Sequence, residues 1–211
     1  FDHPQQSLQS NTIGILNILE IIKKNKFKTK VFNSGSGQFY GDNKKNKYHL
    51  ESKIEPQSPY GVSKAAGYWL TKIYREKYDL FCCTGVLFNH ESVLRSKEFV
   101  TKKIIDTAKK IKKNKNIKLR LGNINIYRDW GWAPEYVEAF WLMLQKKRAE
   151  DLIIGSGTVH SLKEFVEEVF KLQKINKNNL VSNVKQFKRK LDIRGYKADI
   201  SLTKKKLNWK P

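Results

Sequence analysis

Apolar residues recur along this chain at two spacings, which divide it into helices and strands. Apolar residues three or four positions apart predict helices at 11–24, 60–77, 99–112, 134–145 and 161–174. Short continuous apolar runs predict buried strands at 28–33, 81–88, 117–121 and 152–154. Helices that alternate with buried strands are typical of an α/β fold with a doubly wound parallel sheet. With 211 residues, 39% of them hydrophobic, the chain is long enough for one domain or one and a half.

The segments between these elements carry predictions of their own. Residues 42–57 are polar and predict a surface excursion, and the Lys- and Asn-rich residues 171–179 predict a connection. We expect a loop around Arg128, and at 192–199 a ligand-side strand or loop before the last short helix. Ligands of a doubly wound sheet lie beyond the carboxyl ends of its strands, so the turn 33–41 should face a ligand.

Tyr60 and Lys64 lie four residues apart at the start of a predicted helix, after the candidate cap Ser58 and Pro59. Residues i and i+4 share one face of a helix. A free tyrosine has a pKa of about 10, and a cation held beside it lowers that pKa, so that Tyr60 could accept a proton from a hydroxyl group. A surface tyrosine beside a solvated lysine is the alternative interpretation.

The formal net charge of +22 comes mainly from lysines that are scattered along the chain. Scattered lysines indicate solvated surfaces, so we expect no nucleic-acid partner, although anionic nucleotides would be attracted.

The two cysteines, Cys82 and Cys83, are adjacent in a strand-like run where neighbouring side chains point to opposite faces. We therefore expect no disulfide, no metal site and a reducing cytoplasm. No signal peptide and no apolar run of ~20 residues is visible, so we expect no membrane partner.

Further motifs follow the Tyr60 helix in a definite order. They are YREKY at 74–78, LFNHES at 87–92, FVTKKI at 99–104, LGN at 121–123, RDWG at 128–131 and YVEAFWLML at 136–144. In this order and spacing they resemble the extended short-chain dehydrogenase/reductase family, and within it the GDP-mannose 4,6-dehydratases. The resemblance covers residues 11–211.

The resemblance implies an incomplete Rossmann-type doubly wound parallel sheet plus a small mixed α/β substrate-binding domain. Residues 1–97 would form the later part of an NADP-binding domain. Residues 98–211 would form mainly a GDP-sugar-binding domain, with some segments returning to the sheet. The 211 residues contain no G-x-x-G-x-x-G turn, the element that holds a cofactor pyrophosphate at a helix N-terminus. The family implies NADP as cofactor, GDP-mannose as substrate and a homo-oligomer, either a dimer or a tetramer.

Four residues match catalytic positions of the family: Ser36, Gln38, Tyr60 and Lys64. In the dehydratases, a Ser or Thr is followed two residues later by a Glu that exchanges protons at sugar carbons five and six. Here Gln38 stands in place of that Glu, with Gly37 between it and Ser36. An amide has no proton to gain or lose near neutral pH, so water elimination would lack its usual acid and base.

The remaining contacts follow from the resemblance. Lys64 would hold the nicotinamide ribose and lower the pKa of Tyr60, and His90 and Arg95 match cofactor contacts. The positions that match contacts to the GDP-sugar are Asn89, Val100, Lys103, Arg128 and Arg194. Arginine suits phosphate because its planar fork can bond two oxygens at once. Surface or loop residues are the alternative at each position, and Arg128 and Asp129 could form only a loop salt bridge.

Three hypotheses remain open. The first is a GDP-mannose 4,6-dehydratase, favoured by LFNHES and RDWG. The second is a GDP-sugar 4-oxidoreductase or epimerase, which needs Tyr60, Lys64 and Ser36 but no carboxylate. The third is a non-catalytic nucleotide-sugar-binding relative. Gln38 and the lack of a glycine-rich turn favour the second and third.

Overall fold

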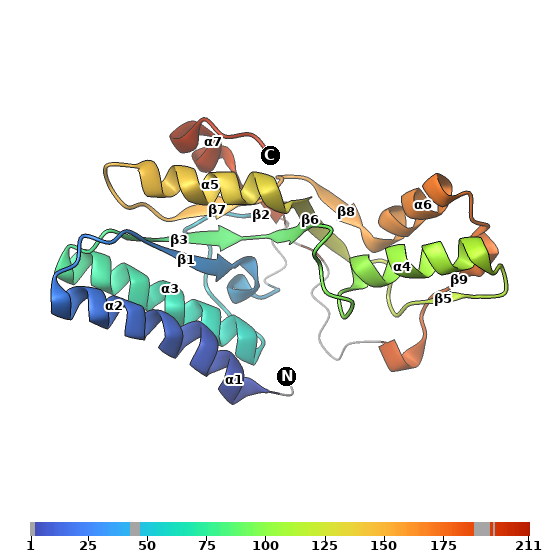
Figure 1. The fold of residues 1–211 in the computed structure, drawn as a ribbon, viewed down its shortest axis with the longest axis horizontal. Helices are drawn as coiled ribbons and strands as arrows, with labels where there is room; N and C mark the ends of the chain where they lie inside the picture. Colours follow the sequence, from blue (N-terminus) through green and yellow to red (C-terminus); the bar gives the residue numbers. More distant parts are fainter. Residues whose placement is uncertain (1–2, 43–46, 188–194, 196) are drawn as a thin grey trace.

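The computed structural model of the chain describes residues 3–42, 47–187, 195 and 197–211. Its central sheet has three parallel strands in the order β1-β3-β7, and their bounds are Val31–Ser36, Cys82–Leu87 and Leu152–Ile154. Helices cover both faces of this sheet (Figure 1). On one face lie α2 (Gly14–Asn25) and α3 (Pro59–Tyr78), and on the other α5 (Ala133–Gln145) and α7 (Ser201–Leu207). The predicted doubly wound α/β arrangement is confirmed.

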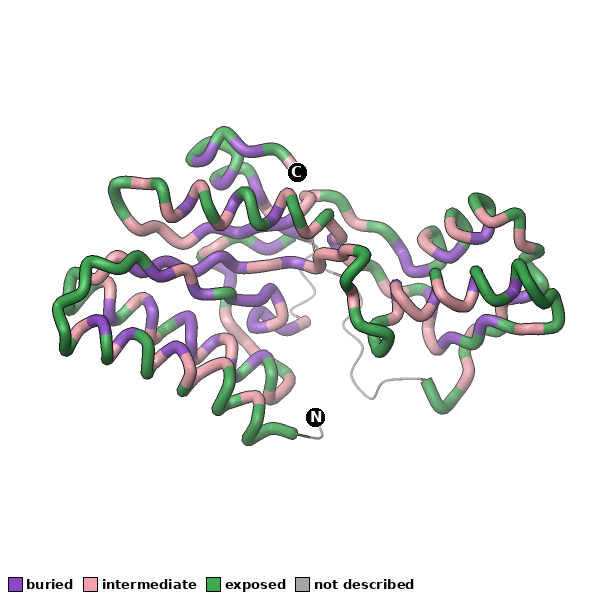
Figure 2. Tube along the Cα trace, viewed as in Figure 1, coloured by how far each residue is buried: buried purple, intermediate pink, exposed green. Residues whose placement is uncertain are grey.

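The buried residues follow the sheet and the helix faces that turn toward it (Figure 2). Leu19 of α2 is fully buried, and Phe32 of β1 stacks on Phe140 of α5 with ring centroids 4.4 Å apart. Burying a side chain such as Leu19 stabilises the fold by roughly 1.5–3 kcal/mol, and truncation to alanine would also leave a cavity. The sheet is thus held from both sides by apolar contacts.

The first helical segment begins earlier than predicted. Helix α1 (Pro4–Leu8) continues through a π-helical turn, Gln9–Ile13, into α2, so the expected start at residue 11 is wrong. Proline suits the first turn because it has no N–H to leave unpaired. In the π turn, Asn11 Nδ2 donates to Ser63 Oγ at 3.1 Å and Thr12 Oγ1 donates to the Ser63 carbonyl at 3.0 Å. The wide turn therefore brings two polar side chains onto α3.

Strand β1 lies three residues later than predicted. The segment 34–36 (SGS) was expected to be a turn because its residues are small and polar, but it pairs with β3 through Ser36 and Leu87. A Cβ on Gly35 would lie 2.7 Å from Thr84 Cγ2, so a small residue is needed for the two strands to pair here. The turn begins only at Gly37, in a 3-10 helix Gly37–Tyr40.

The segment 42–57 is not wholly a surface excursion. Tyr48 lies in β2 (Lys47–Tyr48), is 1% exposed, and stacks on Tyr40 with ring centroids 5.1 Å apart. Its hydroxyl donates to the Gly41 carbonyl at 2.9 Å. Strand β2 pairs with β10 (Lys197–Ala198). Strand β10 lies within residues 192–199, where we expect a ligand-side strand or loop. A single aromatic in a polar run gave too weak a signal for burial.

A second sheet has the order β4-β6-β8, with bounds Asn89–Glu91, Tyr127–Trp132 and Val159–Ser161. The loop expected around Arg128 is therefore wrong, because that residue lies in β6. Near this sheet, α4 (Val100–Lys113) and α6 (Leu162–Gln173) pack on the pair β5 (Leu119–Arg120) and β9 (Leu180–Val181), as Figure 1 shows. Short 3-10 turns lie at Lys177–Asn179 and Lys185–Phe187.

The division into residues 1–97 and 98–211 stays a prediction. Strand β7, from the second range, pairs with β3 of the first, and α7 packs against β7. Among the helices that the structure describes, none combines the length and the apolar character needed to cross a membrane.

Candidate active site

Ser36 is the last residue of β1 and caps the turn that follows it. Its side chain is largely buried, and Oγ accepts a hydrogen bond from the Gln38 N–H at 3.2 Å. Its position at the carboxyl end of a parallel strand is where a doubly wound sheet presents residues to a ligand.

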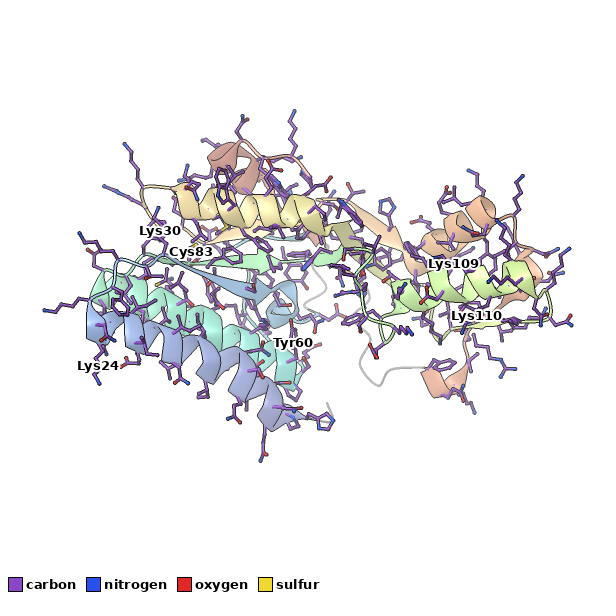
Figure 3. The ribbon with its side chains drawn as sticks, in the orientation of Figure 1. Lys24, Lys30, Tyr60, Cys83, Lys109 and Lys110 are labelled. Carbon is purple, nitrogen blue, oxygen red and sulfur yellow. The ribbon has the colours of Figure 1, made fainter. Side chains whose placement is uncertain are left out.

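Tyr60 lies in the first turn of α3, where the nearby Ser36 hydroxyl lowers the pKa of its phenol. The predicted cap is confirmed, because Ser58 Oγ accepts from the Gly61 N–H at 3.0 Å and Pro59 occupies the first turn. The Tyr60 side chain is not sealed in the core, since the residue is 39% exposed. Figure 3 shows it at the N-terminal end of α3, on the side of the molecule where α4 lies.

The Lys64 ammonium lies on the same face of α3, 5.7 Å from the centroid of the Tyr60 ring. It donates to the Ser34 carbonyl at 2.9 Å. We expected Lys64 to lower the pKa of Tyr60, but burial raises that pKa, and only the Ser36 hydrogen bond and the Arg95 charge oppose the rise. That expectation is wrong because burial outweighs the effects that lower the pKa, and the Lys64 ammonium donates to a backbone carbonyl. Burial also lowers the pKa of Lys64 itself.

Gln38 is half-buried in the 3-10 turn after Ser36. The turn brings its backbone, and not a carboxylate, to Ser36. Gly37 beside it is tightly packed, since a Cβ there would lie 3.1 Å from the Phe88 ring. A serine at position 37 would require that ring to shift by a few tenths of an ångström.

Asn89 and His90 lie in β4, directly after the strand that neighbours β1. Asn89 Oδ1 is buried and accepts no hydrogen bond from the described part of the chain. An orphaned buried acceptor is costly unless a ligand supplies a donor, which fits a substrate contact. His90 Nδ1 lies 2.9 Å from the Phe88 carbonyl oxygen, so this nitrogen carries the proton and Nε2 stays an acceptor in the neutral ring.

Arg95 lies close enough to lower the pKa of Tyr60 through its charge. Its Nε is 2.9 Å from Glu91 Oε2, and its guanidinium carbon is 3.7 Å from the centroid of the Phe99 ring. Arg95 thus links the segment after β4 to the start of α4.

Val100 and Lys103 lie in the first turn of α4. Lys103 Nζ donates to the Arg120 carbonyl at 2.9 Å and lies 3.8 Å from the centroid of the Phe187 ring. Burial lowers the pKa of Lys103. These contacts place Lys103 beside β5.

Arg128 lies in β6, where Nη1 donates to the Tyr127 carbonyl at 2.7 Å. Asp129 beside it is fully buried and accepts hydrogen bonds from Ser156, Gly157 and Ala198, so the alternative of a loop salt bridge with Arg128 is wrong. Arg194, the other predicted arginine, lies outside the described residues.

The structure brings one group of predicted residues together and leaves others apart. Ser36, Tyr60 and Lys64 meet where β1 ends and α3 begins, and β4 with Asn89 and His90 pairs with β6 next to Arg128. Lys103 lies farther along, beside β5. Sequence reasoning missed the role of Asp129, for which the only signal is an acidic residue inside an apolar, aromatic run. Within the described residues, no cluster of His, Cys, Asp or Glu could hold a metal ion.

The sequence model of the GDP-mannose 4,6 dehydratase family matches residues 1–211. GDP-mannose 4,6 dehydratase 1 of Arabidopsis thaliana is 36% identical over 215 residues, which cover 100% of this chain and 59% of the relative. The Homo sapiens GDP-mannose 4,6 dehydratase is 34% identical over 231 residues, which cover 100% of this chain and 62% of that protein. The chain thus spans about three fifths of the length of these relatives.

Solved structures share the fold. A dTDP-glucose 4,6-dehydratase from Bacillus anthracis in complex with NAD matches with a TM-score of 0.86 and 25% identity, over 97% of this chain and 63% of that one. RMD from Pseudomonas aeruginosa, complexed with NADPH, matches with a TM-score of 0.86 and 24% identity, over 100% of this chain and 71% of that one. The α/β fold of the Rossmann type is therefore confirmed, and the chain belongs to the GDP-mannose 4,6 dehydratase family.

Proposed function

We propose that this chain serves the 4,6-dehydration of GDP-mannose. In that reaction carbon four is oxidised, water is lost across carbons five and six, and carbon six is reduced to give the 4-keto-6-deoxy sugar. The observation that carries the proposal is that Ser36, Tyr60 and Lys64 lie together where β1 ends and α3 begins, in a chain of this family.

Tyr60 is proposed to remove the proton of the carbon-four hydroxyl. To accept that proton, Tyr60 must first lose its own proton to solvent, to which the residue is 39% exposed. Burial raises its pKa, so the phenolate needs hydrogen-bond donors and positive charge to stabilise it. Ser36 supplies one hydrogen bond, and the Arg95 charge also favours the phenolate. Lys64 is held by the Ser34 carbonyl on the same face of α3, where its ammonium is proposed to bind the nicotinamide ribose.

A nicotinamide cofactor supplies the hydride chemistry when bound, and we propose that it is NADP. Solved relatives carry NAD or NADPH, and the residues present fit the nicotinamide end. Tyr60, Lys64, His90 and Arg95 would hold that end. Lys64 offers an ammonium, and His90 offers a free Nε2 acceptor. For the pyrophosphate, the 211 residues contain no glycine-rich turn.

On the substrate side, we propose that GDP-mannose contacts Asn89, Val100, Lys103, Arg128 and Arg194. The orphaned Asn89 acceptor supports a contact to a sugar hydroxyl. Arg128 is proposed for the diphosphate, because a guanidinium can bond two phosphate oxygens at once.

Gln38 favours a second candidate function, a GDP-sugar 4-oxidoreductase or epimerase. Hydride exchange at carbon four needs only Ser36, Tyr60 and Lys64. Elimination also needs a group that takes the carbon-five proton, which an amide cannot do. A non-catalytic nucleotide-sugar-binding relative is the third candidate, and it needs only the substrate contacts.

One experiment separates these candidates. The chain is incubated with GDP-mannose deuterated at carbon four and with NADP. The dehydratase is expected to give a 4-keto-6-deoxy product that carries deuterium at carbon six. Transfer of deuterium to NADP without loss of water would support the oxidoreductase. No transfer, together with measurable GDP binding, would leave only the binding function.

We propose further that the protein is a homo-oligomer, through the outward face of α2 and α3. Large apolar residues on this face are 44–55% exposed: Ile13, Ile18, Ile21, Val62, Trp69 and Ile73. The first 22 residues contain no Lys or Arg, although the whole chain has 42. Exposed apolar residues gathered on one face are typical of an interface between protein copies, and the Lys72 ammonium lies 5.3 Å from the centroid of the Trp69 ring on this face. A cytoplasmic location and the lack of a nucleic-acid partner stay predictions.

A further inference from the structure

Asp129 is a fully buried carboxylate whose hydrogen bonds all reach other segments of the chain. Oδ1 accepts from the N–H and the hydroxyl of Ser156, both at 2.7 Å. Oδ2 accepts from the N–H groups of Gly157 and Ala198, both at 3.0 Å. These four donors match the roughly four lone-pair sites of a carboxylate, as a buried acceptor requires.

The donors belong to the part of the fold that carries the Tyr60 site. Ser156 and Gly157 follow β7, a strand of the central sheet, and Ala198 lies in β10, which pairs with β2. Asp129 itself lies in β6, in the separate β4-β6-β8 sheet. Its carboxylate is therefore a tie between the two sheets.

The packing around this tie leaves little room for movement. A Cβ on Gly155 would lie 3.3 Å from both Asp129 oxygens and 2.4 Å from the Ala198 Cβ. The glycine thus allows the β7 segment, β10 and the carboxylate to approach each other closely. Loss of the carboxylate would leave the donors of Ser156, Gly157 and Ala198 without this acceptor.

Arg128 precedes Asp129 on the same strand. Neighbouring side chains of a strand point to opposite faces, so fixing Asp129 between β7 and β10 also fixes the direction in which Arg128 leaves the strand. Arg128 is only partly buried, whereas Asp129 has no exposed surface. Asp129 therefore fixes the strand in place, and Arg128 faces outward from it.

We infer that Asp129 is a positioning residue that holds strand β6, and with it Arg128, at a set place relative to Ser36 and Tyr60. This inference rests on the proposed function, in which Arg128 holds the diphosphate while Tyr60 acts on the sugar. The distance between the two sites is then determined by a buried carboxylate that touches neither ligand nor cofactor.

The test is a double-mutant cycle on GDP affinity, measured by calorimetry with the 211-residue chain. The variants are Arg128→Ala, Asp129→Asn and the double variant, each checked by circular dichroism for an unchanged fold. Asp129→Asn keeps the shape but turns one acceptor into a donor that faces other donors. We expect about tenfold weaker GDP binding for each single variant, and a double variant no weaker than Arg128→Ala. Losses that multiply would show that Asp129 does not act through Arg128, and would overturn the inference.

A second readout does not depend on GDP. Hydrogen exchange of the Ser156, Gly157 and Ala198 amides should become at least tenfold faster in Asp129→Asn, while amides of β3 keep their protection. Unchanged exchange at the three amides would overturn the inference. If the parent chain binds no GDP, the proposed function fails, and the part of the inference that concerns the diphosphate fails with it; the exchange rates still decide whether Asp129 ties the two sheets.

Two further variants complete the design. Asp106→Asn is the matched control, because Asp106 is a partly exposed aspartate of α4 that pairs with Lys102. Asp106→Asn should leave both GDP affinity and hydrogen exchange at the three amides unchanged. A similar loss of GDP affinity in Asp106→Asn would show that the loss of one negative charge weakens GDP binding, and would overturn the inference. Should Asp129→Asn fail to fold, Ser156→Ala removes only one of the four donors and should weaken GDP binding about threefold. Unchanged GDP binding in that variant would count against the inference.

Discussion

The Ser36 hydroxyl, at the end of strand β1, lies near the Tyr60 phenol in the first turn of helix α3 and lowers its pKa. Each residue is held by its own element, because the Ser36 hydroxyl also caps the next turn and Ser58 caps α3. The Tyr60 phenol therefore already has the Ser36 hydroxyl beside it as a hydrogen-bonding group. The first prediction follows from this pair.

Tyr60→Phe should abolish hydride exchange at carbon four while leaving GDP affinity unchanged. The ring and its packing are kept, and only the hydroxyl that exchanges the proton is removed, which typically costs about 10²–10⁴-fold in rate. The measurement is deuterium transfer from carbon four of labelled GDP-mannose to NADP. Val62→Ala, an exposed substitution in the same helix turn, is the control. Full transfer by Tyr60→Phe would remove this residue from the chemistry.

Gln38→Glu should speed the loss of water without changing hydride exchange at carbon four. Oxidation acidifies the carbon-five proton, and a carboxylate at position 38 would be the group that takes it, for a gain of about 10²–10⁴-fold. The measurement is formation of the 4-keto-6-deoxy product at equal cofactor occupancy. An unaltered chain that turns over as fast as the Glu variant would show that another group is the base. Adding Gly37→Ser should give little further gain, because a Cβ at position 37 would lie 3.1 Å from the Phe88 ring.

The elements with strong periodicity were predictable, and those determined by distant partners were not. Helix α3 has a cap, a proline and a continuous apolar face, and its observed bounds differ by one residue at each end from those predicted. Strand β1 continues through Gly35 only because β3 lies beside it, and Tyr48 is buried only because Tyr40 and β10 receive it. Such contacts join residues far apart in sequence, so local spacing carries no signal for them.

The same limit applies to the site. The i, i+4 rule correctly placed Tyr60 and Lys64 on one face, but it could not show that the Lys64 ammonium is directed at the Ser34 carbonyl. The direction of the Tyr60 pKa shift depends on burial, which the sequence does not reveal. The positions of Asn89 and Arg128 on paired strands likewise depend on the β4–β6 pairing.

Asp199→Asn should destabilise the protein at neutral pH and have little effect at pH 2. Hydrogen bonds from Ser201 and the Lys47 ammonium, 2.9 Å away, hold the pKa of Asp199 at about 2, below its usual 3.8. A carboxyl group whose pKa is lower in the folded state stabilises the folded protein at pH values above its unfolded-state pKa. This stabilisation is lost as the pH falls from about 4 to 2. The shift corresponds to at most about 2 kcal/mol, since the side chain is 24% exposed. Urea unfolding at pH 7 and pH 2 measures it. An equal difference at both pH values would contradict the prediction.

The 211-residue chain should bind NADP weakly. The contacts proposed for the cofactor lie at its nicotinamide end, around Tyr60, Lys64, His90 and Arg95, and the 211 residues contain no G-x-x-G-x-x-G turn for the pyrophosphate. Titration followed by nicotinamide fluorescence, using NADPH, should give a dissociation constant well above the micromolar range. Micromolar binding would show that another segment of these residues holds the pyrophosphate.

Trp69→Lys should convert an oligomer of this protein into monomers. Trp69 is 47% exposed on the outward face of α3, beside Ile73 and near the apolar face of α2. A buried lysine without a partner at the centre of an interface between two copies would be costly, and the charge of the second copy would add repulsion. Trp141→Lys is the matched control, because Trp141 is 59% exposed on α5, on the opposite side of the central sheet (Figure 1). Light scattering after size-exclusion chromatography gives the mass of each form. A monomeric parent chain, or an oligomer lost only in Trp141→Lys, would show that the α2–α3 face is not the interface.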